Sequence, residues 1–394
     1  MILVGIDIGK NRHSYCIYKP ETGELLKVPE FFNNDEDGFE RVIESIKPYD
    51  KKDILIGMED TGHYHFTLLK YLLDRSYTIA LINPITTDCQ RRLDGSISKN
   101  DKLDTITICN VLSSNARNKP YRISKVNSFE IYEQRQLTRH HHNLKEELNV
   151  YTNRLQKCID IVFPEFNSLF KSKYGIVYMN VLECLGSAYT IAHTDIRTIK
   201  KCFEINCGGK RISLTAEKLK EAAKKSIGIY SVSDEIQIKH LVRQIKLIEE
   251  QIEEIDKKIE EYSKQTNSPI LSIPGISHFS GTSILAELGS IGNFSNFKQI
   301  IKFAGVAPIH YESSQFNAAH TKISKKGSKY LRKTLYQIIL PVIKFNPVFK
   351  KYYNLKISQG KSHRCAEGHC VRKLLRLIFH LLKTNTQFDP ALLR

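Results

Sequence analysis

Long apolar runs are missing from this sequence, because no stretch reaches the roughly 18 residues that a membrane-spanning helix needs. The first residues, MILVGIDIGK, lack a basic leader and a small-residue cleavage site, so we expect no signal peptide. The nine cysteines are odd in number and irregularly spaced, which favours reduced thiols in a cytoplasm. Tight CxxC-like pairs are also absent, which argues against a cysteine zinc site. The sequence therefore predicts a cytoplasmic protein without a membrane partner.

Acidic residues are scarce at the far end of the chain. Residues 320–394 contain 17 lysines and arginines but only two acids, Glu367 and Asp389. This region therefore carries nearly all of the formal net charge of +17. A solubilising surface would explain such a surplus, but its concentration in one apolar, helical region favours a surface that binds phosphates.

The first 125 residues alternate between strand and helix patterns, within a chain long enough for two or three domains. Three expected strands are followed by helix, strand, helix, strand and helix, which is the order of a ribonuclease-H-like (RuvC-like) mixed α/β sheet. We expect strands at residues 2–8, 13–18, 24–32, 53–58 and 77–82, and helices at residues 38–46 and 64–73.

Four carboxylates follow this pattern. Asp7 lies on the first expected strand and Glu59 ends the fourth, while Asp101 and Asp104 open a helix after residues 83–100. Positions i and i+3 share one face of a helix, so the last two side chains can point at one spot. A carboxylate within a strand costs desolvation unless it is paired or bound to a metal. Hard cations such as Mg²⁺ prefer clusters of this kind, so the four acids are candidate metal ligands.

Two heptad patterns lie in residues 126–265 and predict long coiled-coil helices, which pair antiparallel with each other or with another subunit. Residues 163–233 between them form a mixed insertion to which the sequence assigns no chemistry. Three consecutive histidines, at positions 140–142, point in different directions on a helix and are more typical of a helical surface than of a metal site. The first seam comprises Leu137, His141, Leu144, Leu148, Tyr151, Leu155, Cys158 and Val162, and the second comprises Ile238, Leu241, Ile245, Ile248, Ile252, Ile255, Ile259 and Tyr262.

Residues 266–394 predict a third, mainly helical region. Residues 273–277, IPGIS, are typical of either a helix-hairpin-helix turn that approaches a phosphate or a plain helical turn. Ser313 lies in a polar loop, YESSQF, and residues 366–382 form an amphipathic helix. Basic side chains in this region are candidate nucleic-acid contacts: Lys322, Lys325, Lys326, Lys329, Arg332, Lys333, Arg372, Lys373 and Arg376.

With these motifs in order, the chain resembles the DEDD-type insertion-sequence transposases, the serine-using family also described as bridge-RNA-guided recombinases. Asp7 in GIDIGK, Glu59 in MEDTGHYH, and Asp101 and Asp104 in SKNDKLDT match the acids of that family. The segment from IPGISHFSG to FAGVAP, then YESSQF and KISKKGSKYLRK, match its C-terminal domain. Ser314 departs from the glycine of many relatives, and the insertion at 163–233 is longer than usual.

The resemblance implies that Ser313 is a nucleophile that forms a covalent phosphoserine with DNA, and that the four acids hold Mg²⁺, with Mn²⁺ as a substitute. It also implies donor and target DNA, a non-coding guide RNA, and a homo-oligomer (a dimer or tetramer) in which one subunit's serine meets another's acids. Such a protein would be nucleoid-associated.

Three other functions compete with this hypothesis. A metal-dependent nuclease, similar to a Holliday-junction resolvase, would use the four acids alone. An actin-like kinase would share GIDIGK, but its second phosphate loop and its adenosine site are not apparent. A non-catalytic nucleic-acid scaffold would give Asp7 and Glu59 a structural role only.

Overall fold

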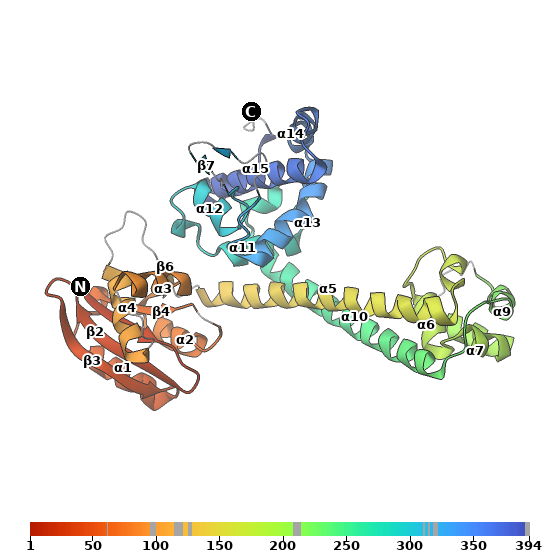
Figure 1. The fold of residues 1–394 in the computed structure, drawn as a ribbon, viewed down its shortest axis with the longest axis horizontal. Coiled ribbons are helices and arrows are strands. Elements are labelled where there is room, and N and C mark those ends of the chain that lie inside the picture. Colours follow the sequence, from red (N-terminus) through yellow and green to blue (C-terminus); the bar gives the residue numbers. More distant parts are fainter. Residues whose placement is uncertain are drawn as a thin grey trace. The chain divides into compact units, whose positions relative to one another are not determined.

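The structure, a computed structural model, describes residues 1–60, 62–94, 100–113, 121–124, 128–207, 214–309, 312–313, 316–317 and 322–390. The chain divides into two compact units, and Figure 1 traces its helices and strands in order along the sequence. The first comprises residues 1–133, 288–303 and 375–384, and the second comprises residues 134–287, 304–374 and 385–394. Within the described residues, no helix combines the length and the apolar character that crossing a membrane requires.

A six-stranded mixed sheet forms the centre of the first unit, in the order β3-β2-β1-β4-β5-β6. Strands β1, β4 and β5 run parallel to one another, and β2, β3 and β6 each pair antiparallel with a neighbour. This arrangement confirms the predicted mixed α/β sheet and is compatible with a ribonuclease-H-like fold, although β6 was not predicted. The strands are β1 (Ile2–Asp7), β2 (Arg12–Lys19), β3 (Glu24–Asn33), β4 (Ile54–Glu59), β5 (Thr78–Ile82) and β6 (Tyr121–Ser124).

Alternate residues of these strands enter two different cores, as the pleat of a strand requires. Ile2, Val4 and Ile6 pack on one face of the sheet with α1 (Glu36–Ile46) and α2 (Phe66–Asp74). Leu3 packs on the opposite face with α4 (Asp101–Ser113). The alternation therefore assigns Asp7 to the face of the sheet that α4 covers.

Two glycines let α4 lie close to the sheet. Gly5 of β1 and Gly57 of β4 are partners in the parallel register. A Cβ on Gly5 would lie 2.2 Å from the carbonyl oxygen of Thr105, and a Cβ on Gly57 would lie 2.7 Å from Cδ1 of Leu112. Both strands carry glycine two residues before their terminal acid, so the helix approaches the sheet just beside Asp7 and Glu59.

Two helices of 35 residues each, α5 (Ser128–Val162) and α10 (Val232–Thr266), carry the two heptad seams. Leu144, near the middle of α5, packs with Ile252 and Ile259 in the second half of α10. Leu155, late in α5, packs with Ile238, early in α10. The two helices of one chain therefore pair antiparallel along the predicted seams. This pairing already buries the seam residues, so a second subunit is not needed to cover them.

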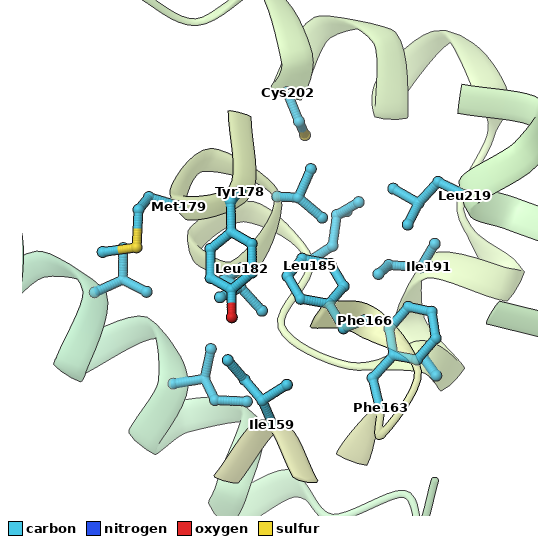
Figure 2. Close-up of a cluster of buried hydrophobic side chains, with 14 of the residues drawn as sticks. Ile159, Phe163, Phe166, Tyr178, Met179, Leu182, Leu185, Ile191, Cys202 and Leu219 are labelled. Carbon is cyan, nitrogen blue, oxygen red and sulfur yellow. The ribbon is translucent and has the colours of Figure 1, made fainter. Parts of the chain in front are cut away.

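The segment between the two long helices forms a lobe with its own core, shown in Figure 2. Phe163, Phe166, Tyr178 and Leu182 are almost completely buried there. The cluster also includes Leu155 and Ile245, so the lobe packs onto the ends of α5 and α10. Its helices are η2 (Phe166–Leu169), α6 (Ile176–Cys184), α7 (Ala188–His193), α8 (Ile196–Glu204) and α9 (Ala216–Lys224).

The three consecutive histidines differ from the expectation of a helical surface, because His141 and His142 are buried. His141 packs against Phe279, with ring centroids 4.0 Å apart. His142 Nε2 lies 3.0 Å from the Thr334 hydroxyl. Burial lowers the pKa of both histidines to about 4. These neutral rings therefore join α5 to the helices that follow it in the second unit.

The rest of the chain is mainly helical, as predicted. It contains one short two-stranded ribbon, β7 (Glu312–Ser313) and β8 (Phe316–Asn317). The helices are η3 (Pro269–Ser272), α11 (His278–Leu288), η4 (Ile291–Asn293), α12 (Phe297–Phe303), α13 (Lys329–Phe345), α14 (Pro347–Ser358) and α15 (His363–Thr384).

Gly5→Ala should destabilise the first unit, because its new methyl group would meet the backbone of α4. We expect a loss of about 1–3 kcal/mol, the usual cost of overpacking. Urea denaturation followed by circular dichroism measures it. Gly292→Ala is the matched control, since its Cβ would lie an ordinary 3.4 Å from the Ser290 hydroxyl oxygen. Equal stability of the two variants would contradict the close packing of α4.

Candidate active site

Asp7 and Glu59 lie at the same edge of the sheet. Each is the last residue of its strand, and the strands β1 and β4 are parallel neighbours. Both side chains are partly buried. Because side chains alternate along a strand, both acids also belong to the face that α4 covers. The sequence prediction of two acids ending adjacent strands therefore agrees with the structure.

Asp104 comes to the same edge from α4. It lies one turn into the helix that begins at Asp101 and is only 5% exposed. The side chain of Asp101 lies outside the described part of the structure. Three of the four predicted acids can therefore be placed by their side chains, and all three line one pocket.

Helix α3 (Pro84–Leu93), which the sequence did not predict, forms another wall of this pocket. Asn83 caps the helix, because its side chain accepts a hydrogen bond from the Ile85 amide, and Pro84 occupies the first turn. An asparagine cap followed by proline is a signature of a helix start. The missed signal matters because α3 supplies Thr87 and Arg91 to the site.

Arg91 and Thr87 contact two of the predicted acids. Arg91 donates from Nε to Oδ1 of Asp104 at 2.9 Å, and its Nη2 is ion-paired with the same oxygen at 2.8 Å. Its Nη1 lies 3.5 Å from Oδ1 of Asp88. The Thr87 hydroxyl donates to Glu59 and also to the Pro84 carbonyl. These contacts bring charged and polar side chains of α3, β4 and α4 together at one position of the pocket.

The resulting pocket has a volume of about 540 Å³. Carboxylates of four residues and guanidinium groups of two residues line it, together with hydroxyl and aromatic side chains. The lining residues are Asp7, Ile8, Gly9, Arg12, Ser14, Phe31, Glu59, Gly62, Tyr64, Pro84, Thr87, Asp88, Arg91 and Asp104.

The donor chemistry of the pocket fits Mg²⁺ or Mn²⁺, since its carboxylate and hydroxyl oxygens are ligands that hard cations prefer. Among the residues that the structure describes, no three acids, histidines or cysteines converge closely enough to form a metal-binding group. Asp104 is ion-paired with Arg91, and Glu59 accepts a hydrogen bond from Thr87. The acids therefore share a pocket without forming a closed coordination shell.

Ser313 ends the short strand β7, where it pairs with Phe316 of β8 across a two-residue connection. Its backbone thus lies in a hairpin rather than in the irregular loop that we expected. Its side chain and Ser314 lie outside the described residues. Ser313 belongs to the second unit, whereas the acids belong to the first.

The basic residues after this hairpin fall into two groups. Lys322, Lys325, Lys326 and Lys329 are exposed. Arg332 instead donates to the carbonyl oxygens of Ala304 and Lys325, and Lys333 pairs with Glu146 at 2.8 Å. The first group is available to a phosphate, whereas the second group already supports the local fold.

Helix α15 includes the predicted amphipathic helix and its three basic residues. Arg372 donates to Nδ1 of His369, at 3.1 Å. Lys373 lies 4.6 Å from the ring centroid of Tyr352, and Arg376 lies 4.5 Å from that of Phe297. Arg376 is exposed, and the other two are partly buried. Cations over aromatic rings keep their charge, so these contacts are compatible with a phosphate-binding role.

A buried acid supports the segment that follows the hairpin. Glu287, at the end of α11, accepts hydrogen bonds from Arg139 of α5 and from the Ser328 hydroxyl. Burial alone would raise the pKa of Glu287, but the hydrogen bonds and charge of Arg139 lower it below its usual value. Ser328 also caps α13. The ionised Glu287 therefore connects three elements around the start of α13.

The glycine of the IPGIS turn serves packing. Gly275 has a φ of +98°, and a Cβ there would lie 2.7 Å from the Val342 amide nitrogen of α13. The close approach that glycine permits is thus made to a helix backbone. The helix-hairpin-helix and the plain helical turn therefore both stay predictions for this segment.

Comparisons with known proteins agree with these motifs. A family model described as a transposase matches residues 4–164, and the model of the transposase IS116/IS110/IS902 family matches residues 267–354. A pilin gene-inverting protein of Moraxella bovis is 20% identical over 99% of this chain and 98% of its own length. A mini-circle putative transposase for IS117 from Streptomyces coelicolor is 22% identical over 98% of this chain and 95% of its own.

A pilin gene-inverting protein of Moraxella lacunata is 27% identical over 32% of this chain and 39% of its own length. The two family matches together cover both the acids of the first unit and the serine hairpin. From these matches, the chain belongs to the IS110 family of insertion-sequence transposases, and it is an enzyme that acts on DNA.

Proposed function

We propose that this transposase exchanges DNA strands through a covalent phosphoserine at Ser313, assisted by Mg²⁺ that Asp7, Glu59, Asp101 and Asp104 hold. The observation that carries the proposal is the pocket in which Asp7, Glu59 and Asp104 meet at one edge of the sheet. The family match adds the serine hairpin to these acids. On the same grounds, we propose that the first unit carries out RuvC-like metal-dependent chemistry.

The proposed strand exchange consists of two transesterification steps. The Ser313 oxygen forms a bond to a backbone phosphorus while the bond from that phosphorus to a sugar oxygen breaks. The serine proton leaves, and the released sugar oxygen gains a proton to become a hydroxyl. A sugar hydroxyl then attacks the phosphoserine and releases the serine. Each step replaces one phosphoester bond by another, so no ATP is required.

The acids and the lysines have separate roles in this proposal. When bound, the cation would offset phosphate charge and stabilise the attacking and leaving oxygens. The exposed Lys322, Lys325 and Lys326 would bind neighbouring phosphates and position the strand, since phosphate contacts fix register and orientation. Their charge suits this task better than proton transfer.

Ser313→Ala separates the recombinase from a nuclease that uses the acids alone. We expect the variant to lose the covalent protein–DNA adduct and at least about a thousandfold of its strand cleavage, because the nucleophile is removed. Denaturing gels with labelled DNA measure both. Ser314→Ala is the matched control and should retain the adduct. Undiminished cutting by Ser313→Ala would favour the nuclease.

A guide RNA would supply sequence recognition, and the protein would bind shape and backbone. The strongly basic terminal region agrees with two nucleic-acid partners. We expect the purified protein to carry one discrete non-coding RNA whose segments pair with donor and target DNA. Sequencing the RNA that co-purifies tests this. A heterogeneous mixture of cellular RNA would contradict guidance but would leave the serine chemistry intact.

We further propose a dimer or tetramer in which the serine of one subunit meets the acids of another. The separation of Ser313 and the acids into two compact units supports this arrangement. Mixed oligomers of Ser313→Ala and Asp7→Asn should then regain adduct formation, because some sites receive an intact serine and an intact acid. Homo-oligomers of each variant are the controls. No adduct in the mixture would place both groups in one subunit.

A further inference from the structure

The strongest unassigned feature of the acidic pocket is the guanidinium of Arg91. Two of its nitrogens, Nε and Nη2, contact the same oxygen of Asp104, at 2.9 and 2.8 Å. The side chains are 16% and 6% exposed. This contact is a charged pair with little access to water, at an acid that the proposed function assigns to a metal.

Burial explains why Asp104 needs a cation. An ionised carboxylate that loses its water without a partner costs several kcal/mol, so a buried acid is paired or bound to a metal. Arg91 provides that partner here. A divalent cation would provide the same compensation with twice the charge. The Asp104 Oδ1 atom accepts from Nε of Arg91 and is ion-paired with its Nη2, so a cation that coordinates through this oxygen competes with the guanidinium.

A second partner for Arg91 lies on its own helix. Asp88, one turn earlier in α3, is 3.5 Å from Nη1 of Arg91, and its side chain is 46% exposed. Asp88 also lines the pocket. The guanidinium can therefore leave Asp104 and remain paired with Asp88 without moving the helix, because residues three apart are neighbours on a helix face.

We propose that Arg91 is an exchangeable internal cation that neutralises Asp104 in the metal-free protein and that a divalent metal ion displaces toward Asp88. The proposal rests on the metal site of the proposed function and adds to it a residue that competes with the metal. Arg91 thereby keeps the pocket folded before loading and weakens the binding of the metal. It acts through Asp104 and is a positioning residue.

Arg91→Ala tests the exchange through metal binding. Calorimetric titration of the nucleic-acid-free, full-length protein with Mn²⁺ should give a Kd about tenfold lower than that of the unmodified protein, because a hydrogen-bonded competitor has been removed. The thermal midpoint of the metal-free variant should fall, and saturating Mn²⁺ should restore it. Arg91→Gln, which keeps a hydrogen-bond donor, replaces Arg91→Ala if the latter does not fold.

Two other arginines serve as controls. Arg92 pairs with Asp88 at 2.8 Å from the same helix, but its side chain is 79% exposed. Arg92→Ala leaves the Arg91–Asp104 pair in place and frees Asp88, so it should not weaken Mn²⁺ binding and should change the Kd less than Arg91→Ala does. Arg12 lines the pocket and stacks over Phe31, 4.4 Å from its ring centroid. Arg12→Ala removes a positive charge from the pocket without removing the competitor, so its effect should be smaller than that of Arg91→Ala.

The outcomes separate this inference from the proposed function. An unchanged or higher Mn²⁺ Kd in Arg91→Ala would contradict the proposed displacement of Arg91. Arg91 would then only stabilise the fold, and the metal site would remain intact. An equal gain in Arg12→Ala would also overturn it, since general electrostatics would then suffice. If no protein binds Mn²⁺, the metal site itself fails, and the exchange fails with it.

Discussion

The close approach of α4 to β1 and β4 is the constraint on which the acidic pocket depends. Two glycines, side by side in the parallel register, leave room for the helix: Gly5 for the backbone of Thr105 and Gly57 for the side chain of Leu112. Ile108, Val111 and Leu112 of α4 are then buried against the sheet, and each such side chain contributes about 1.5–3 kcal/mol. Apolar side chains of similar size in place of a buried ion pair such as Arg91–Asp104 would cost little stability, although loss of one partner alone is destabilising. Apolar packing therefore determines the position of Asp104.

The sequence predicted the centre of the first unit well, because the sheet follows from local patterns. Strand alternation, turn residues and the acids at the ends of β1 and β4 all depend on neighbours in the chain. Helix α3 was not predicted, because its polar residues face the pocket and the usual apolar stripe is absent. The Asn83–Pro84 start is the signal that remains in the sequence. The role of Arg91 depends on a contact across 13 residues, which no local pattern encodes.

Burial in the second unit was predictable in part. The heptad seams predicted which faces of α5 and α10 meet, because a repeat of 3.5 residues places them on one stripe. His142 does not belong to that repeat. It is buried because Thr334 of α13 and Phe279 of α11 cover it, and both follow much later in the chain. The Gly275 turn shows the same limit, since the α13 backbone that packs against this glycine follows much later in the chain.

The paired helices α5 and α10 have a mechanical consequence. At 1.5 Å per residue, each 35-residue helix is about 52 Å long. The distal lobe shares its core with their far ends, so it follows any tilt of the pair. A rotation of about 6° near the other end would carry the lobe through about 5 Å, given that helix length. Conversely, a modest force on the lobe exerts a large torque on the region around His142 and Thr334.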